Sequence, residues 1–242
     1  MVGCQKSMLK ALFQNVTEAE KDTAVASIIQ HATPRHDFFL MLTLSVSMAS
    51  FGLLLGSSII LVGSMLIAPL LYPLLSLALG IILADDKLIS NSIYTILKSV
   101  GFALGAGLAI GFLFSTHTGV SASLLVTSAP SSLMYAIVAA IAGFAAAFAM
   151  TKPYLNDTLP GVAISVALVP PLAAAGLALS VFDWVVFSSS LLLFLVNVIG
   201  IVFSAMIVFA LFHFSVKKTV AHEAIKEEEK VIKKEAHEAQ AA

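Results

Sequence analysis

The residues with the clearest chemical potential are prolines inside long apolar stretches. Pro69 and Pro73 lie in the run GSMLIAPLLYPLLSLALG, and Pro170 and Pro171 lie in GVAISVALVPPLAAAGLA. A proline inside a helix removes one backbone donor and displaces the carbonyl four residues earlier. In hydrocarbon the freed carbonyl needs a new partner, which can be a neighbouring helix, a hydroxyl, water or a bound solute. The pattern therefore predicts two broken helices that expose carbonyls near the bilayer midplane.

Polar side chains accompany these breaks and complete a candidate solute-binding set. Asn197 lies in the apolar run LLLFLVNVIGIVFSAMIVF, where an unpaired amide is costly, so it either bonds a neighbouring helix or contacts a solute. The alternative for the prolines is that they only kink helices for packing, with serines repairing the backbone. The candidate substrate-binding residues are Ser64, Pro69, Tyr72, Pro73, Ser76, Ser99, Ser165, Pro170, Pro171 and Asn197.

Other kinds of chemistry lack their residues. No Asp or Glu lies in the core of an apolar stretch, and no Cys/His or His/Asp/Glu cluster offers metal ligands or a nucleophile with its base. The sequence has no phosphate-binding G-x-x-x-x-G-K-[ST] loop. We therefore expect no enzymatic activity, no catalytic residue, no metal and no cofactor.

The composition identifies the solvent in which these residues must work. Of 242 residues, 59% are hydrophobic and 11% charged, and the mean hydropathy is +1.00. Soluble domains carry roughly 25% charged residues. The net charge of −1 and the single cysteine, Cys4, exclude a basic nucleic-acid binder and a disulfide scaffold. An integral protein of the lipid bilayer remains.

The charges gather at the two ends and leave stretches long enough to cross a bilayer. About 20 apolar residues are needed for each crossing. Only seven charged residues lie between Phe38 and Phe214. The six predicted spans are Phe38–Leu55, Ile59–Leu83, Ile93–Phe114, Leu133–Met150, Val162–Val181 and Phe187–Phe214.

The lysines predict the orientation. With six spans, all 13 Lys and Arg fall on the side of the N-terminus, and positive charge is retained in the cytoplasm during insertion. We expect a multi-pass protein of the cell (inner) membrane with both termini cytoplasmic. Its predicted parts are an amphipathic cytoplasmic segment (1–37), a first transmembrane repeat (38–114), an external loop (115–132), a second repeat (133–214) and a charged helical cytoplasmic tail (215–242).

Two halves of the chain match at an offset of 98 residues. Gly63 then superimposes on Gly161, Pro73 on Pro171 and Asp85 on Asp183. Three spans in each unit make the second unit enter the membrane from the opposite side. The predicted fold is all-α, with six transmembrane helices in an inverted 3+3 repeat whose second and fifth helices are broken. Secondary transporters often have this architecture, and some pores share it.

Several residues have a structural interpretation beside a functional one. Asp85 and Asp183 precede long helical stretches, so capping of free N–H groups is preferred over ligand binding. Lys98 lies close to the inner boundary and is expected to extend towards the cytoplasm. Two interleaved G-x-x-x-G pairs allow close helix contacts within one chain or between subunits, and we expect a homo-oligomer. These glycines are Gly101, Gly105, Gly107 and Gly111.

The two ends are expected to be helical. Apolar residues at helical spacing in the first 16 residues predict an amphipathic helix on the inner membrane surface. The tail SVKKTVAHEAIKEEEKVIKKEAHEAQAA is strongly helix-forming. A solvated helix is preferred for it over a coiled coil.

The run TPRHDFFLMLTLSVSMASFGLLLGSSIILVGSMLIAPLLYPLLSLALGIILADDKLI resembles the start of the prokaryotic "uncharacterised hydrophobic domain" family, a domain-of-unknown-function family numbered three-eight-nine. LPGVAISVALVPPLAAAGLAL and LLLFLVNVIGI are similar to its second half. The resemblance covers roughly residues 35–214 and departs at Leu71–Tyr72, where a smaller residue is expected before Pro73. It implies the fold and a membrane location, but no substrate.

The preferred function is therefore a secondary transporter or permease for an unidentified small solute or ion, with a midplane site between spans two and five. One alternative is an oligomeric channel whose polar faces line a pore between subunits. Another is a non-transporting membrane scaffold whose charged ends recruit a cytoplasmic partner. No nucleic-acid partner is expected.

Overall fold

The computed structural model describes residues 17–118, 132–151, 160–214 and 218–241, and this part of the chain contains helices and no strand. The predicted amphipathic helix of the first 16 residues and most of the predicted external loop lie outside it. The helices are α2 (Glu18–Ala32), α3 (His36–Leu54), α4 (Ser58–Ile67), α5 (Leu71–Leu83), α6 (Asp86–Thr118), α7 (Ser132–Met150), α8 (Pro160–Ser180), α9 (Trp184–Leu211) and α10 (Lys218–Ala241).

Helices occupy all six predicted ranges, but they differ in length. Within the described residues, α3, α6 and α9 are long and apolar enough to cross a membrane, and α4 and α5 together form a fourth candidate with a 52° bend. The described apolar parts of α7 and α8, Met134–Met150 and Leu168–Ser180, are shorter. The chain is thus an all-helical protein with the apolar helices of a membrane protein.

The structure has a break between α4 and α5 within the second predicted span, and Pro69 explains its position. The residue before a proline is driven to an extended conformation. Ala68 has φ −73° and ψ 124°, and it ends α4. Pro73 lies in the first turn of α5, where a missing N–H leaves no acceptor unpaired. The sequence predicted that Pro73 interrupts a helix near the midplane. In the structure it does not interrupt a helix, because it lies at the beginning of one.

The predicted break in the fifth span is wrong. Helix α8 continues through both Pro170 and Pro171 to Ser180. It packs against α3, α4, α5, α6, α7 and α9, and its residues from Leu168 to Ala178 are buried apart from the half-buried Pro170. Contacts on every side hold α8 helical despite the backbone hydrogen bonds that two prolines remove.

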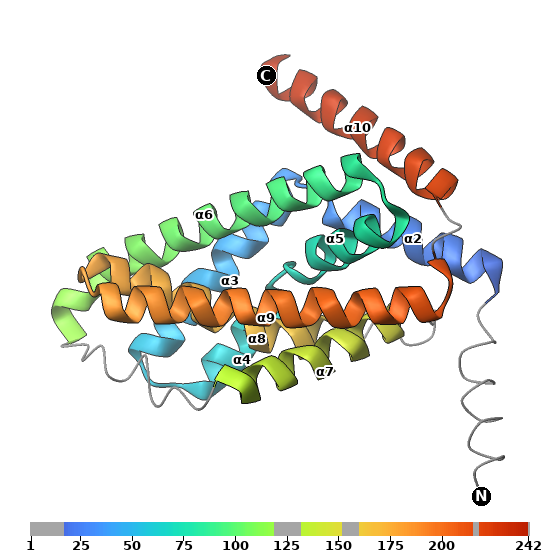
Figure 1. Cartoon of the computed structure of the whole chain (residues 1–242). Helices are drawn as coiled ribbons and strands as arrows, with labels where there is room; N and C mark the ends of the chain where they lie inside the picture. The colour runs from blue at the N-terminus through green and yellow to red at the C-terminus, as the bar shows by residue number, and fades with distance from the viewer. Residues whose placement is uncertain (1–16, 119–131, 152–159, 215–217, 242) are drawn as a thin grey trace, which may run out of the picture.

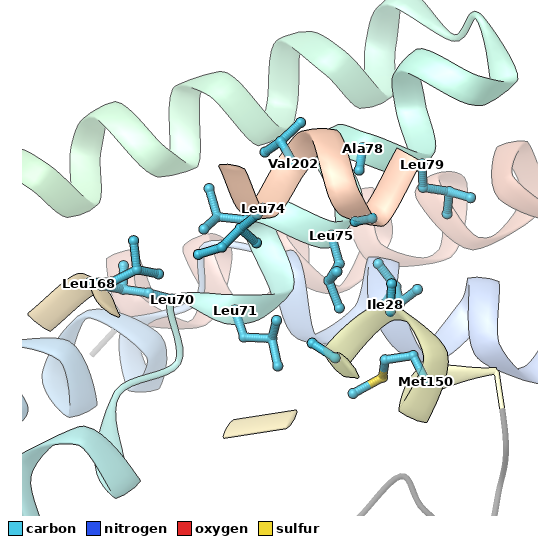
Figure 2. Close-up of a cluster of buried hydrophobic side chains, with 14 of the residues drawn as sticks. Ile28, Leu70, Leu71, Leu74, Leu75, Ala78, Leu79, Met150, Leu168 and Val202 are labelled. Atoms are coloured by element: carbon cyan, nitrogen blue, oxygen red, sulfur yellow. The ribbon is translucent and has the colours of Figure 1, made fainter. Parts of the chain in front are cut away.

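Helix α5 forms the centre of the packed core. It lies between α6 and α9 in Figure 1, and it also contacts α2 and α8. Figure 2 shows its leucines surrounded by Ile28 of α2, Met150 of α7, Leu168 of α8 and Val202 of α9. Leu75, Ala78 and Leu79 are fully buried. The short helix after the break is therefore held from several sides.

The ends of the chain are more closely integrated than the sequence indicated. Helix α2 buries Val25 and Ile28 completely and packs against α5. The predicted tail helix is confirmed as α10, but one face of its first half is buried. Ala221 and Ile225 are buried, and α10 packs against α2. The apolar residues in α2 and α10 are too few to mark a span, yet enough to cover one end of the helical core.

The two predicted aspartate caps are confirmed, and the turns that hold them are alike. Ala84 and Phe182, 98 residues apart, both have a left-handed backbone, with φ of 48° and 55°. The next residue in each case, Asp85 or Asp183, donates its N–H to the carbonyl five residues earlier at 3.0 Å. This hydrogen bond belongs to the Schellman ending of a helix.

The aspartate carboxylates then begin the following helices. Asp85 Oδ1 accepts from the N–H of Leu88 at 3.1 Å. Asp183 Oδ1 accepts from the N–H groups of Val185 and Val186 at 3.1 and 3.0 Å. Each carboxylate satisfies donors that the first helical turn leaves free.

Glycines bring α6 and α8 into close contact. A Cβ atom placed on Gly107 would lie 2.9 Å from the Cα atom of Gly176. Gly111 also faces α8, at Ser180. By contrast, a Cβ on Gly101 or Gly105 would meet nothing within 4 Å. One of the two predicted glycine pairs therefore packs within the chain and the other does not.

Candidate functional site

The predicted residues around the α4–α5 break are distributed over separate contacts. The Ser64 hydroxyl donates to the Leu61 carbonyl at 2.7 Å, and the Ser64 carbonyl accepts from the Ser45 hydroxyl at 2.7 Å. A hydroxyl from α3 thus supports a carbonyl in the last turn of α4, as the packing interpretation expects. The Tyr72 ring stacks on His31 of α2 at 4.6 Å between centroids. Pro69 lies in the break itself.

The remaining predicted residues lie elsewhere in the helices. The Ser99 hydroxyl is buried and donates to the Thr95 carbonyl at 2.7 Å. Asn197 is 2% exposed and belongs to the buried stripe of α9, which favours helix packing over solute contact. Pro170 and Pro171 lie inside α8. Ser165 is in the same helix, but its side chain is outside the described structure.

Ser76 is the predicted site residue that lines a polar cavity. It is 1% exposed, and its Oγ accepts from Ser92 Oγ of α6 at 2.9 Å. Ser92 and Thr95 are also buried, and the Thr95 hydroxyl donates to the Asn91 carbonyl at 2.9 Å. Ser99 is not among the lining residues, and its hydroxyl bonds to the carbonyl of Thr95 in the same helix. The cavity thus begins at the contact between α5 and α6.

Four helices and one connection enclose the cavity, which has a volume of about 380 Å³. Helix α2 and the turn after it form one side, α5 and the first half of α6 form the floor, and α10 forms another side. The lining residues are Ile29, Ala32, Thr33, Pro34, Ser76, Leu88, Asn91, Ser92, Tyr94, Thr95, Lys98, Ile225, Glu228 and Ile232.

Two charged side chains line the cavity, and their surroundings differ. Glu228 of α10 is held by Arg35, with an Nη2 to Oε2 distance of 2.7 Å. Lys98 of α6 places its ammonium nitrogen 4.6 Å from the ring centroid of Phe39 and 5.8 Å from that of Tyr94. Both distances are within the range of cation–π attraction. Lys98 is exposed, as its expected extension out of the core requires.

A second contact fastens α10 beside the cavity. His222 Nδ1 lies 2.9 Å from Asp85 Oδ2, and Asp85 is only 2% exposed. Arg35–Glu228 and His222–Asp85 therefore join α10 to two different parts of the helical core. Together they hold the wall formed by Ile225, Glu228 and Ile232 in place.

This arrangement is suited to binding a small polar solute. Hydroxyl, amide and ammonium groups supply hydrogen-bond donors, and apolar residues such as Leu88 and Ile225 enclose them. The serines have no adjacent base that would activate a nucleophile in the cavity as described.

Comparison with known proteins places the chain in a family. Residues 65–203 match the family described as "Domain of unknown function (DUF389)". The chain belongs to this family. It is also 34% identical over 177 residues to the uncharacterized protein MJ0678 of Methanocaldococcus jannaschii. That match covers 73% of the chain and 54% of the relative, so the chain spans about half the length of the curated relative it matches. No solved structure matches the chain.

The DUF389 match confirms the resemblance drawn from the sequence, and it includes most of the cavity floor. Sequence reasoning overlooked Asn91, Ser92 and Thr95, because no proline marks them. The spacing of these three residues could have identified them as one face of a helix. Together with Lys98 and Ser99, they form one polar stripe along an otherwise apolar helix. Glu228 could not be associated with this stripe, because no sequence pattern brings the tail to α6.

Proposed function

We propose that this protein is a secondary transporter of a small solute, with a binding site in the cavity between α2, α5, α6 and α10. The observation that carries this proposal is the buried hydroxyl pair Ser76–Ser92 at the floor of a 380 Å³ cavity. Buried hydroxyls in an apolar helical core are costly unless they bond to each other or to a ligand. In this proposal the site lies beside Ser76, in the middle of α5, rather than between two broken helices as predicted.

The proposal includes an inverted repeat of two three-helix units. It is supported by the matching turns at Asp85 and Asp183 and by exchanged helix contacts, because α6 packs on α8 while α9 packs on α5. At the offset of 98, the Gly107–Gly176 contact corresponds to Ala205 and Ala78, which are both fully buried. Two similar units that move against each other suit alternating access. The cavity itself is lined by α5 and α6 of the first unit together with α2 and α10.

The break between α4 and α5 would serve as the hinge of this movement. Hinges are short segments that absorb changes of backbone angle, and residues 68–70 join two helices at 52°. We place both chain ends on the cytoplasmic face of the cell membrane, because the positive charges then all lie on that side. The cavity beside α10 would open to the cytoplasm.

Binding and flux measurements on purified protein test this function. Thermal unfolding in the presence of ions, amino acids, organic acids and sugars would identify a stabilising solute, and proteoliposomes would measure its saturable uptake. Ser76→Ala should weaken both. Ser50→Ala is the matched control, because the buried Ser50 hydroxyl donates to Val46 of its own helix and does not line the cavity. Equal effects of the two variants would refute the site.

An oligomeric channel is the second candidate, and the open Gly101–Gly105 face of α6 favours it. Close helix contacts in membranes use such faces, and no described residue occupies the space beside either glycine. A homo-oligomer joined through α6 could enclose a pore. Single-channel currents in planar bilayers would support the channel, whereas saturable uptake without currents would support the transporter.

A further inference from the structure

We propose that the solute bound in this cavity is a small organic anion, recognised by Lys98. The inference rests on the proposed function and names the substrate class of the same site. It follows from the charges, the hydrogen-bond donors and the size of the cavity, and each of these is a separate observation.

The cavity carries one positive charge that no carboxylate balances. The Glu228 carboxylate is engaged by Arg35 at 2.7 Å. Within the described residues, the contacts of the Lys98 ammonium are the ring faces of Phe39 and Tyr94, at 4.6 and 5.8 Å. Ring faces attract a cation more weakly than a carboxylate does, and the exposed Lys98 is accessible to a charged solute. An anionic solute would supply the missing partner.

The hydrogen-bond donors of the cavity point to the same class. Ser92 donates to Ser76, so the hydrogen of the Ser76 hydroxyl is left without an acceptor among the described residues. Ser76 is 1% exposed and lines the cavity, so its hydroxyl can donate to a solute bound there. The Asn91 side chain, on the same wall, adds an amide that can also donate. A carboxylate, which only accepts hydrogen bonds when ionised, matches this set.

The volume limits the anion to a small one. Cavities that hold drug-sized ligands measure about 300–1,000 Å³, and this cavity of about 380 Å³ lies near the lower limit. Apolar side chains of Ile29, Leu88 and Ile225 would contact a short carbon chain. Lactate is a suitable probe, because lactamide has nearly the same shape without the charge.

A lipid phosphate is the other source of oxyanion chemistry near Lys98. Lys98 also borders a groove of about 560 Å³ on the outside of α3 and α6, lined by Thr43, Lys98, Gly101, Phe102, Gly105 and Ala106. Thr43 is the one hydroxyl among these residues, whereas the cavity offers several. We therefore assign the charge to a solute in the cavity and treat a lipid as a competing outcome of the test.

The test measures thermal unfolding of the full chain in uncharged detergent, with titrations of sodium lactate and of lactamide. The variants are wild type, Lys98→Met, Lys98→Arg and the control Lys87→Met, which removes an exposed lysine of the same helix outside the cavity. We expect lactate to raise the unfolding temperature and lactamide to have no effect. Lys98→Met should weaken lactate binding about tenfold or more, because a charge-assisted contact is lost. Lys98→Arg and Lys87→Met should retain it.

The outcomes separate this inference from the proposed function. One outcome is that lactamide or the cation ethanolamine stabilises the protein, while lactate, acetate, succinate and phosphate do not. That result would refute an anionic substrate but would still agree with a solute-binding site in the cavity. No stabilisation by any of these probes or by the wider solute screen would refute the site itself. If lactate has no effect and phosphatidylglycerol co-purifies with wild type but not with Lys98→Met, the lysine serves a lipid and the inference is wrong. If Lys98→Met fails to fold, the comparison of lactate with lactamide on wild type and Lys98→Arg still tests whether the bound solute is an anion.

Discussion

Nδ1 of His222 lies 2.9 Å from Oδ2 of Asp85, and this contact joins the charged C-terminal helix to the first turn of α6. The other carboxylate oxygen of Asp85 caps α6 at the N–H of Leu88. Asp183, the counterpart of Asp85 in the second half, caps α9 in the same way but is partly exposed. The difference between the two carboxylates is that α10 covers the first one. A carboxylate that is 2% exposed needs such a partner to remain buried.

The first prediction concerns His222→Ala. Loss of the imidazole should loosen α10 without unfolding the apolar helices, because the other residues of the core are unchanged. The His222 side chain is 47% exposed, so the contact is screened and the expected loss is only about 0.5–1 kcal/mol. Hydrogen exchange of α10 measures it. Glu223→Ala is the control, since Glu223 is exposed on the same helix. Equal exchange rates in the two variants would show that the His222–Asp85 contact does not hold α10.

The Arg35–Glu228 pair provides a second prediction about access to the cavity. Glu228→Gln should weaken the contact that holds α10 over the cavity, so reagents should enter faster. The rate of thiol labelling of Asn91→Cys, in a chain whose native cysteine is removed by Cys4→Ser, measures the entry. We expect an increase of a few-fold. Glu227→Gln, which changes an exposed neighbour, should leave the labelling rate unaltered.

The third prediction is a double-mutant cycle at the cavity floor. Ser76→Ala leaves the buried Ser92 hydroxyl without its acceptor, which should lower the free energy of unfolding by about 1–3 kcal/mol. Ser92→Ala should cost less, because Ser76 then keeps a free hydroxyl next to the cavity. The double variant should be no worse than Ser76→Ala alone, since it leaves no unsatisfied group. Additive losses in thermal or denaturant unfolding would show that the two hydroxyls do not interact.

The sequence predicted the parts of the fold that depend on local chemistry. Asp85 and Asp183 could be identified as caps because a carboxylate just before a helix can accept hydrogen bonds from the free N–H groups of its first turn. Pro69 predicted a break because a proline constrains the residue before it. Pro170 and Pro171 misled the same reasoning, because the packing of six helices around α8 holds it together and is not visible in a local pattern.

The candidate site was predictable only in part, and for a similar reason. Ser76 was included because it lies near the prolines, yet its partner Ser92 belongs to another helix and its cavity is closed by α10. Pairing between residues 16 positions apart in different helices, or between Arg35 and Glu228, depends on tertiary contacts. Ser64 and Tyr72 were included because they lie near the prolines in sequence, and their contacts in the structure are with the Leu61 carbonyl and the His31 ring.

The fourth prediction tests the origin of the bend between α4 and α5. Pro69→Ala restores a backbone N–H and releases Ala68 from its extended conformation, so the two helices should straighten from 52°. Spin labels at Ile59 and Ile81, both exposed, should then move further apart in pulsed electron resonance measurements. Pro73→Ala should leave the distance unchanged, because Pro73 lies in the first turn of α5. A bend that persists in Pro69→Ala would mean that packing, not proline, sets the angle.

The last prediction contrasts two glycines of one helix. A Cβ on Gly107 would lie 2.9 Å from the Cα of Gly176, so Gly107→Ala must force α6 and α8 apart and should lower the free energy of unfolding by about 1–3 kcal/mol. Gly105→Ala meets open space and should be neutral or stabilise the helix by up to about 1 kcal/mol, because alanine has the better helix propensity. Thermal unfolding at a protein concentration low enough to keep the chain monomeric measures both. The same variants run at high concentration examine the outer face: if Gly105→Ala weakens self-association while Gly107→Ala does not, α6 uses one glycine pair to fold and the other to assemble.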